Sequence, residues 1–362
     1  MYLCGVNIGG YLSQVKENNF TKEHLENFVT EYDFKRIKQW GFSVIRLPVD
    51  YMLFDPRGKG DFDAEKIRYI DRAFDYADKY GLNIILDYHI VQGHTFSSRE
   101  KKKNDIWDKT SENRQRFLET WDFFSQRYAK YKTVMFEIMN EPVADEAQFW
   151  NILAKEALGV IRKNAPHNYV VIESNKWGIP HTFGELGVLD DPKIIYSFHC
   201  YEPILVTHQL AEWVPFVNKD IYVKNVAYPG RAEGIAGVAE KIKDSDEAAF
   251  AEFLKGQDRE YNRESLYETI KPVIDFRKKY DVPVLCGEFG CIAKAAPETR
   301  KNWLTDIISI FRQEKISYTY WSYKNMDFGI YDFTKKYADN PNYDEKERLD
   351  KATLETLQDG IL

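Results

Sequence analysis

Two glutamates in similar settings are the residues of this chain best placed to do chemistry. Glu141 follows the apolar run 133–139, and Glu288 follows a second apolar run at 282–287. Runs this short, with helical patterns around them, indicate buried parallel strands. Ligands of α/β proteins bind at the carboxyl ends of such strands. Glu141 also stands between an amide and a chain-breaking proline, in Asn140-Glu141-Pro142. Two carboxyl groups in such places suggest paired acid/base chemistry.

The elements that must position these glutamates alternate between strands and helices nearly to the end of the chain. Expected strands cover residues 3–8, 43–47, 83–87, 133–139, 169–173, 193–199, 282–287 and 318–321. Apolar residues at helical spacing fall between them, at 25–40, 67–77, 111–131, 146–163, 263–280 and 298–314, with a closing helix at 351–357. After the fifth strand only 183–186 shows weak helical periodicity. Eight such units predict an α/β fold, a (β/α)8 TIM barrel, as a single catalytic domain over residues 1–362.

A doubly wound sheet is the competing α/β fold. It normally has fewer strands and often carries a glycine-rich phosphate-binding turn. Gly5, Gly9 and Gly10 stand near the first strand but lack the G-x-G-x-x-G spacing of that turn. The barrel is therefore the better prediction.

A long segment at 203–261 separates the sixth strand from its helix. Its length, about 60 residues, far exceeds the usual loop of roughly 2–6. It contains Trp213, Tyr222 and Tyr228 and a helix-like stretch at 234–243. We expect an inserted subdomain at the mouth of the barrel, forming a wall of the binding cleft. The polar stretch 331–347 is expected to be a loop after the eighth strand.

Composition excludes several classes of function. A net charge of −7 argues against a nucleic-acid partner and gives no reason to expect an anionic membrane surface. No apolar run approaches the roughly 20 residues of a membrane span, and no leader opens the chain. The cysteines have no zinc-ligand spacing and are expected to be free thiols; they are Cys4, Cys200, Cys286 and Cys291. We expect a monomer that is cytoplasmic, or secreted with its leader absent from this sequence, and that needs no metal and no cofactor.

Polar and aromatic residues, the two glutamates among them, fall at the ends of the expected strands. A lone histidine or arginine at such a place is usually structural, but so many at one rim are harder to explain in that way. The set comprises Asn7, Arg46, His89, Asn140, Glu141, His199, Tyr201, Glu288 and Trp321.

These residues and their neighbours resemble glycoside hydrolase family 5, the retaining cellulase and mannanase family on a (β/α)8 barrel. The matching segments come in the family order over nearly the whole chain. They are Gly5-Val6-Asn7-Ile8-Gly9-Gly10, Arg46-Leu47-Pro48, Leu86-Asp87-Tyr88-His89, Asn140-Glu141-Pro142, His199-Cys200-Tyr201, Gly287-Glu288-Phe289-Gly290 and Trp321. Any one segment is a weak signal, but the ordered set is specific.

The resemblance implies a role for each matching residue. Glu141 is the acid/base and Glu288 the nucleophile of a β-glucan hydrolase. Asn140 binds the 2-hydroxyl of the reacting sugar, and Arg46 and Tyr201 position Glu288. His89 and His199 line the substrate site, and Trp321 stacks under the sugar.

The chemistry of glycoside cleavage agrees with these roles. One carboxyl group must be protonated and the other ionised, and a retaining enzyme holds the two about 5–5.5 Å apart. Arg46 should keep Glu288 ionised, while burial and the nearby charge should raise the pKa of Glu141. Glu137 shares the strand face of Glu141, roughly 13 Å deeper at 3.3 Å per residue, and is expected to be a buried structural carboxylate paired with an arginine.

The polymer and its linkage stay open on the sequence alone. Ile90-Val91-Gln92-Gly93 replaces the Pro-Gly that family members often carry after the third-strand histidine, so the third loop has its own shape. The candidates are β-1,4-glucan, mixed-linkage β-1,3-1,4-glucan, β-1,3-glucan, β-mannan and xyloglucan. A catalytically inactive carbohydrate-binding barrel is the alternative from another class, but a lectin needs neither glutamate. A metal-dependent hydrolase lacks support, because the 7 histidines form no H-x-H or H-x-x-x-H pair.

Overall fold

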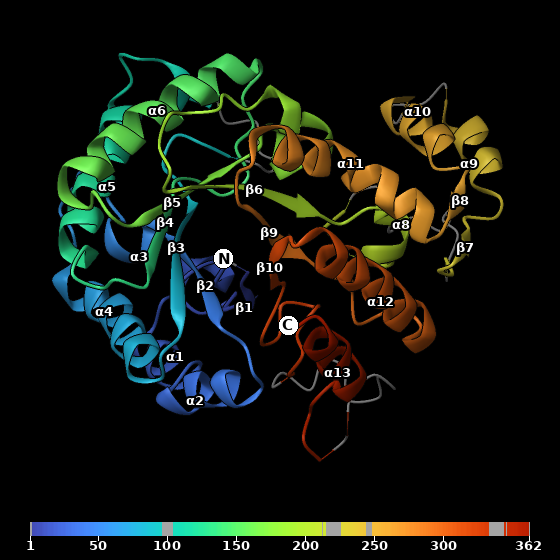
Figure 1. The fold of residues 1–362 in the computed structure, drawn as a ribbon, viewed down its shortest axis with the longest axis horizontal. Helices are drawn as coiled ribbons and strands as arrows, with labels where there is room; N and C mark the ends of the chain where they lie inside the picture. Colours follow the sequence, from blue (N-terminus) through green and yellow to red (C-terminus); the bar gives the residue numbers. More distant parts are fainter. Residues whose placement is uncertain are drawn as a thin grey trace. The chain divides into compact units, whose positions relative to one another are not determined.

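The computed structural model describes residues 2–95, 104–211, 213–214, 226–243, 248–332, 344 and 346–361. Over these residues eight strands close into a parallel barrel in the order β1-β10-β9-β6-β5-β4-β3-β2 (Figure 1). The strands are β1 (Cys4–Asn7), β2 (Val44–Asp50), β3 (Asn83–Ile90), β4 (Val134–Glu137), β5 (Tyr169–Glu173), β6 (Ile194–Cys200), β9 (Val284–Phe289) and β10 (Ser317–Tyr320). The TIM-barrel prediction is confirmed.

An apolar layer fills the barrel interior near the start of its strands. It takes one buried side chain from each of seven neighbouring segments: Leu3, Val44, Ile85, Met135, Val171, Ile195 and Leu285. Side chains two residues further along a strand point to the same face. The residues after this layer are therefore the ones that project into the barrel toward its carboxyl-end rim.

Helices follow the strands along the chain. In the first part they are α1 (Lys22–Asn27), α2 (Glu31–Gln39), α3 (Tyr51–Phe54), α4 (Ala64–Lys79), α5 (Glu112–Tyr128), α6 (Ala147–Asn164) and α7 (Asn175–Gly178), with short 3-10 helices at Lys16–Asn18, Asp105–Trp107 and Pro180–Glu185. In Figure 1 the helices α2, α4, α5 and α6 lie outside the strands β2 to β5. Helix α4 buries Ile67, Ile70 and Phe74, the residues whose spacing predicts it.

The prediction of one helix over 25–40 is wrong, because two helices occupy this segment. Thr30 begins α2 in a capping box: its backbone N–H donates to the Asp33 carboxylate at 2.8 Å. Such a box satisfies the free N–H groups at the start of a new helix. The helical structure is therefore interrupted between Asn27 and Glu31, although the apolar residues keep their helical spacing across this interruption.

The chain divides into two compact units. The first comprises residues 1–199, 272–288 and 316–321, and contains nearly all of the barrel strands. The second comprises 200–271, 289–315 and 322–362. Its elements are α8 (Ile204–Thr207), a two-stranded antiparallel sheet of β7 (Gly230–Arg231) and β8 (Glu260–Tyr261), α9 (Ile235–Ile242), α10 (Ala248–Gly256), α12 (Pro297–Glu314) and α13 (Lys351–Asp359), while α11 (Arg263–Tyr280) continues into the first unit.

The expected insertion after the sixth strand has secondary structure of its own. The helix expected at 234–243 is α9, and the sequence pattern missed α8, α10 and the two-stranded sheet of β7 and β8. Tyr222 and most of the expected loop at 331–347 lie outside the described residues. The bounds 203–261 and the description as a single domain stay predictions.

Two smaller expectations concern the thiols and the helices. All four cysteines are buried and none is joined to another by a disulfide bond, as the sequence predicts. Of the helices in the described part of the chain, none has the length and apolar character needed to cross a bilayer.

Candidate active site

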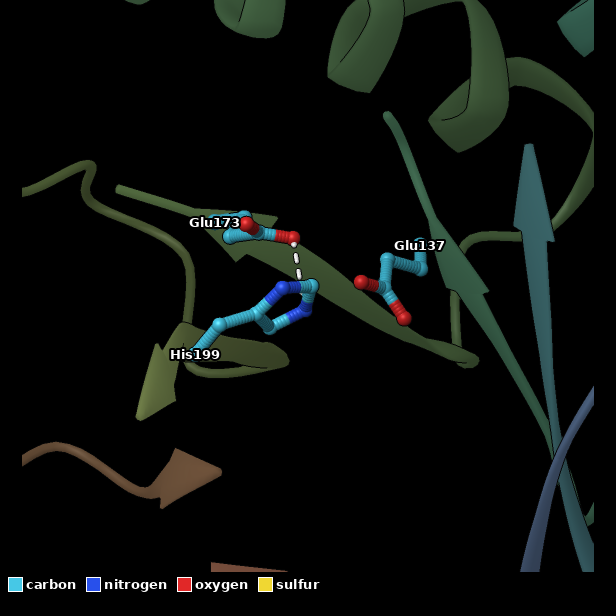
Figure 2. A group of neighbouring side chains, drawn as sticks. All are labelled: Glu137, Glu173 and His199. Carbon is cyan, nitrogen blue, oxygen red and sulfur yellow. Dashed lines mark ion pairs between the residues drawn. The ribbon is translucent and has the colours of Figure 1, made fainter. Parts of the chain in front are cut away.

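A polar layer lies directly above the apolar layer of the barrel. Arg46 follows Val44 by two residues, Glu137 follows Met135, and Glu173 follows Val171, so each has the inward strand parity. His199 comes four residues after Ile195 and shares its face. Figure 2 shows Glu137, Glu173 and His199 converging from β4, β5 and β6. Strand periodicity thus places charged groups where a barrel of this kind binds its ligands.

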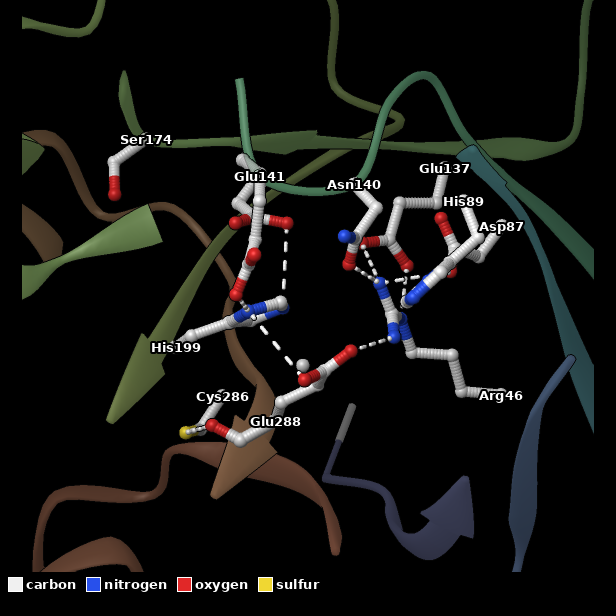
Figure 3. A network of polar contacts seen from close by, with 12 residues as sticks. Arg46, Asp87, His89, Glu137, Asn140, Glu141, Ser174, His199, Cys286 and Glu288 are labelled. Atoms are coloured by element: carbon white, nitrogen blue, oxygen red, sulfur yellow. Dashed lines mark hydrogen bonds and ion pairs between the residues drawn. The ribbon is translucent and has the colours of Figure 1, made fainter. Parts of the chain in front are cut away.

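Arg46 is the buried cation of this layer. Its guanidinium donates to both Glu137 oxygens at 2.7 and 2.9 Å and to Glu288 Oε1 at 2.6 Å (Figure 3). It also donates to the amide oxygens of Asn7 and Asn140, each at 2.9 Å. Although burial disfavours its charge, the surrounding carboxylates raise the pKa of Arg46 well above its ordinary value. A permanent positive charge therefore stands beneath the rim.

Glu137 is a structural carboxylate, as the sequence predicts, with no exposed surface and a bidentate contact to arginine. Its expected depth of about 13 Å below Glu141 does not isolate it from the site, because Arg46 forms ion pairs with both Glu137 and Glu288. Burial raises the pKa of Glu137, and Arg46 opposes that shift.

The segment that carries Glu141 is extended beyond β4 and pinned on both sides. The strand ends at Glu137, but the N–H of Ile138 donates to Val171 O at 3.1 Å and that of Asn140 to Tyr88 O at 3.2 Å. Glu141 itself takes a left-handed backbone conformation, with φ of 46°. A non-glycine residue in that conformation costs about 1–3 kcal/mol and is typical of functional sites.

Neighbouring loops hold this strained turn in place. Asn175 exchanges two hydrogen bonds with the backbone of Ala144, at 2.9 and 3.0 Å. The N–H of Val143 donates to Nε2 of His94 at 3.2 Å. Burial lowers the pKa of His94 to about 4, so at neutral pH the ring is uncharged and can accept this bond. The loops after β3 and β5 therefore fix the turn that carries Glu141.

The two candidate catalytic carboxyl groups face each other. Carboxylate oxygens of Glu141 and Glu288 lie within 4.8 Å of one another, with a ring nitrogen of His199 in the same group. The two side chains are 17% and 7% exposed, so a ligand can reach them although most of their surface is covered. Burial raises the pKa of Glu141 well above its ordinary value, and the charge of Glu288 adds to the shift. One group is thus biased to hold a proton, while Arg46 beside the other favours a carboxylate.

His89 and Trp321 form a stacked pair of buried rings. Their rings stack almost parallel, with centroids 5.8 Å apart and an interplanar angle of 6°. Asp87 Oδ2 lies 2.7 Å from His89 Nδ1 and 3.0 Å from Arg46 Nη2. Burial raises the pKa of Asp87 to about 7 against the opposing charge of Arg46, and burial lowers that of His89 to about 4. His89 is accordingly a neutral ring at working pH.

Asn140 has a buried donor available to a ligand. Its oxygen accepts from Arg46, while its Nδ2 has no hydrogen-bond partner among the described residues. The amide orientation is thereby fixed by the arginine, with the NH₂ group left to bind an acceptor.

His199 links the acid/base candidate to a further carboxyl group. Its Nδ1 lies 3.1 Å from Glu141 Oε1 and 3.8 Å from Glu288 Oε2, and its Nε2 lies 3.3 Å from Glu173 Oε2. Burial lowers the pKa of His199 well below its ordinary value. Burial likewise raises the pKa of Glu173 well above the usual range.

Tyr201 makes its recorded ring contacts within the second unit. It lies one residue beyond β6 in the second unit, where its ring packs edge-on against His208 at 4.9 Å and Phe328 at 5.8 Å. Its expected role beside Glu288 stays a prediction.

Among the residues that the structure describes, two sets of three side chains have ligand atoms close enough to hold a metal ion. They are Glu137, Glu173 and His199, and Glu141, His199 and Glu288. Arg46 already compensates one carboxylate of each set at hydrogen-bond distance, Glu137 at 2.7 Å and Glu288 at 2.6 Å. The expectation of no metal and no cofactor stays a prediction.

Reasoning from the sequence did not single out Asp87 or Glu173 as site residues. Both carry a signal that could have found them: Asp87 stands two residues before His89 on the same strand face, and Glu173 closes the fifth strand.

Comparison with known proteins gives a consistent family. The model of the family described as cellulase (glycosyl hydrolase family 5) matches residues 11–327. Endoglucanase C of Acetivibrio thermocellus is 34% identical over 337 residues, which cover 92% of this chain and 95% of that protein. Cellodextrinase A of Ruminococcus flavefaciens is 30% identical over 316 residues, covering 86% and 83%.

A solved structure shares the fold. The crystal structure of endoglucanase Cel5A from the hyperthermophilic Thermotoga maritima superposes with a TM-score of 0.71 at 25% identity, covering 98% of this chain and 96% of that one. On the sequence alone, Tyr228-Pro229-Gly230, Cys286-Gly287-Glu288-Phe289-Gly290 and the segment 323–328 resemble a clostridial-type endoglucanase C in detail, and the 34% identity to Endoglucanase C of Acetivibrio thermocellus agrees with that resemblance.

Proposed function

The chain belongs to the cellulase family, glycosyl hydrolase family 5, and we propose that it cleaves a β-glucan by double displacement, with Glu141 as acid/base and Glu288 as nucleophile. It is a glycoside hydrolase of the endo-β-glucanase type. Within that activity, the two residue roles, the retention of configuration and the linkage that is cut are the parts we propose.

The observation that carries the proposal is the distance between the two carboxyl groups. Their oxygens approach within 4.8 Å. Retaining glycosidases hold the two groups about 5–5.5 Å apart, whereas inverting enzymes leave roughly 6.5–9.5 Å for a water molecule. An approach this close supports the retaining arrangement, in which a carboxylate and not a water molecule attacks the sugar.

The charges around each glutamate support the division of roles. Glu288 accepts from Arg46 at 2.6 Å, which favours the ionised form that a nucleophile needs. Glu141 is buried beside that negative charge, and both effects raise its pKa, as a general acid requires.

The reaction then runs in two steps. An oxygen of Glu288 attacks the anomeric carbon, and the glycosidic C–O bond breaks as Glu141 gives its proton to the leaving oxygen. In the second step the Glu141 carboxylate takes a proton from water, whose oxygen attacks the same carbon and releases Glu288. The two inversions at the anomeric carbon give net retention.

Neighbouring groups have matching tasks in binding. The free Nδ2 of Asn140 can donate to the 2-hydroxyl of the reacting sugar. Trp321, held parallel to His89, can cover the apolar face of a pyranose ring. The relatives named endoglucanase and cellodextrinase support a glucan substrate. We propose that this glucan is β-1,4-linked or of mixed β-1,3-1,4 linkage.

Two alanine variants test the roles. Glu141→Ala should lower kcat on cellooligosaccharides by roughly 10²–10⁴-fold, yet still turn over substrates with an activated aryl leaving group. Added azide should rescue it and form a β-glycosyl azide, whereas Glu288→Ala should form at most the α-azide. Glu137→Gln is the matched control, since it alters a carboxyl group of the same segment that takes no part in bond making.

The opposite azide pattern would mean that the roles are reversed. An alanine variant at either position with near-wild-type activity would refute the carboxylate pair. A panel of defined oligosaccharides, extended to β-mannan, xyloglucan and β-1,3-glucan, identifies the linkage from the products.

A further inference from the structure

Glu173 carries a buried carboxyl group that the proposed mechanism does not use. It is the last residue of β5, and none of its surface is exposed. Neither of its carboxyl oxygens forms a hydrogen bond with a described residue. His199 faces it, with Nε2 3.3 Å from Oε2, as the dashed line in Figure 2 marks.

The surroundings of Glu173 disfavour a negative charge. After burial itself, the carboxyl groups of Glu137, Glu141 and Glu288 act to keep a proton on it, while Arg46 opposes them. That arginine is already engaged by Glu137, Glu288 and Asp87 at 2.6–3.0 Å. A buried carboxyl group with no closely paired cation is more stable as the neutral acid.

The loop after β5 covers this carboxyl group. Gly178 has φ of +68°, and a Cβ added to it would lie 2.1 Å from Glu173 Oε1. Glycine is therefore required on two grounds, the left-handed backbone and the close approach. The main chain of Gly178 packs so closely against the Glu173 carboxyl group that any larger residue at this position would displace it.

The His199 ring joins Glu173 to the acid/base candidate. Nε2 faces Glu173, and Nδ1 lies 3.1 Å from Glu141 Oε1. Burial, together with the nearby charge of Arg46, keeps the imidazole neutral. A neutral imidazole carries one proton, so one ring nitrogen donates and the other accepts.

Two arrangements of that proton have opposite consequences. With Glu173 neutral, its O–H points at Nε2, the ring proton is on Nδ1, and Nδ1–H donates to Glu141 Oε1. The acidic proton of Glu141 must then be on Oε2, the oxygen that His199 does not occupy. With Glu173 ionised, Nε2–H donates to it, and Nδ1 accepts the Glu141 proton, which then points at the histidine instead of the substrate.

We propose that Glu173 is a positioning residue that, as a neutral carboxylic acid, fixes the Nδ1–H tautomer of His199 and so holds the proton of Glu141 on the oxygen free to serve the leaving group. This inference rests on the proposed role of Glu141. It assigns a task to a residue that does not touch the substrate.

Substitution of Glu173 separates positioning from packing. Glu173→Gln is neutral and keeps an N–H donor for Nε2, so it should retain most of the kcat that Glu173→Ala loses. Glu173→Ala should lower kcat on cellooligosaccharides roughly 10- to 100-fold, a part of the 10²–10⁴ that a general acid contributes, with KM nearly unchanged. Activated aryl glycosides, which need little acid assistance, should be affected much less.

Ser174→Ala is the matched control on the same strand end. The Ser174 hydroxyl donates to Ile179 O at 3.1 Å in the loop after β5. Its loss should lower the melting temperature and leave the ratio of oligosaccharide to aryl-glycoside activity unchanged. A purely structural role of Glu173 predicts the same unchanged ratio for Glu173→Ala, and that result would overturn the proposal.

The tautomer can be read without any activity measurement. Nitrogen-15 NMR of histidine-labelled enzyme, with His199 assigned through His199→Gln, should show Nδ1–H in the wild type and in Glu173→Gln. An Nε2–H tautomer in the wild type, or equal loss of kcat in Glu173→Gln and Glu173→Ala, would overturn the inference. Failure of azide to rescue Glu141→Ala would instead refute the proposed function, whatever the tautomer.

Discussion

Replacement of Arg46 by methionine is the perturbation that reaches most of the site at once. Methionine keeps much of the length of the side chain but removes every donor to Glu137, Glu288, Asn7 and Asn140. The carboxyl groups that shared this buried cation then lose it. We expect a folded protein with a weakened barrel interior and a poor nucleophile.

The expected magnitudes differ for stability and for rate. Removing one partner of a buried ion pair costs about 3–5 kcal/mol. At an unfolding entropy of about 2.1 cal/mol/K per residue, that cost lowers Tm by about 4–7 °C in a chain of this length. The hydrogen bond to ionised Glu288 contributes about 1.5–3 kcal/mol, so kcat should fall roughly 10- to 150-fold.

Glu137→Gln separates the two effects. It removes the bidentate pair below the site but leaves the 2.6 Å hydrogen bond between Arg46 and Glu288. Stability should fall while most of kcat remains, as measured by calorimetry and by initial rates on an aryl β-cellobioside and on cellooligosaccharides. Equal loss of kcat in the two variants, or a wild-type rate in folded Arg46→Met, would refute the reasoning.

Three further outcomes are expected. Glu141 must be protonated to act, and its pKa is raised, so the rate should persist above the ordinary glutamate pKa range and fall as pH rises through the pKa of Glu141. Glu141→Ala, assayed on an aryl β-cellobioside, should lose this alkaline fall of the pH–rate profile. An unchanged alkaline fall in that variant contradicts the assignment. Asn140→Ala should lower kcat more than it raises KM on cellooligosaccharides, and an equal effect on a 2-deoxy substrate analogue would show that Nδ2 does not bind the 2-hydroxyl. Dialysis against EDTA should leave the rate unchanged, because Arg46 compensates the carboxylates; a loss restored by one divalent cation would point to the histidine–carboxylate sets instead.

The elements with strong periodic patterns were predictable from the sequence. Alternating strands and helices set the barrel, and strand parity set which residues face inward. The interruption of the helix at Thr30 was not predictable, because the apolar residues keep their helical spacing across the capping box that starts a new helix there. The segment after β5 also defied periodicity, since Lys176, Trp177 and Gly178 all take positive φ there.

The candidate site was predictable for the residues that motifs mark at strand ends, and less predictable for the buried residues below them. Glu141 and Glu288 come together because both segments end at the same rim. Glu288 is a special case: Gly287, not Glu288, shares the inward parity of Leu285, yet the Glu288 carboxylate reaches Arg46. The proposed role of Glu173 depends on His199 and Glu141, which belong to other strand ends. No local sequence pattern predicts which buried carboxyl group a histidine will face.

Covalent trapping tests the central claim most directly. A 2-deoxy-2-fluoro-β-cellobiosyl fluoride carries a good leaving group, while its fluorine disfavours the oxocarbenium-like transition states of both steps, so a glycosyl-enzyme should accumulate. Mass spectrometry of the intact protein and of its peptides should show one fluorocellobiosyl group on Glu288, and NMR should show the β-anomer as the first product of normal turnover. An adduct on Glu141 would reverse the roles, and no adduct together with an α-anomer as the first product would contradict double displacement.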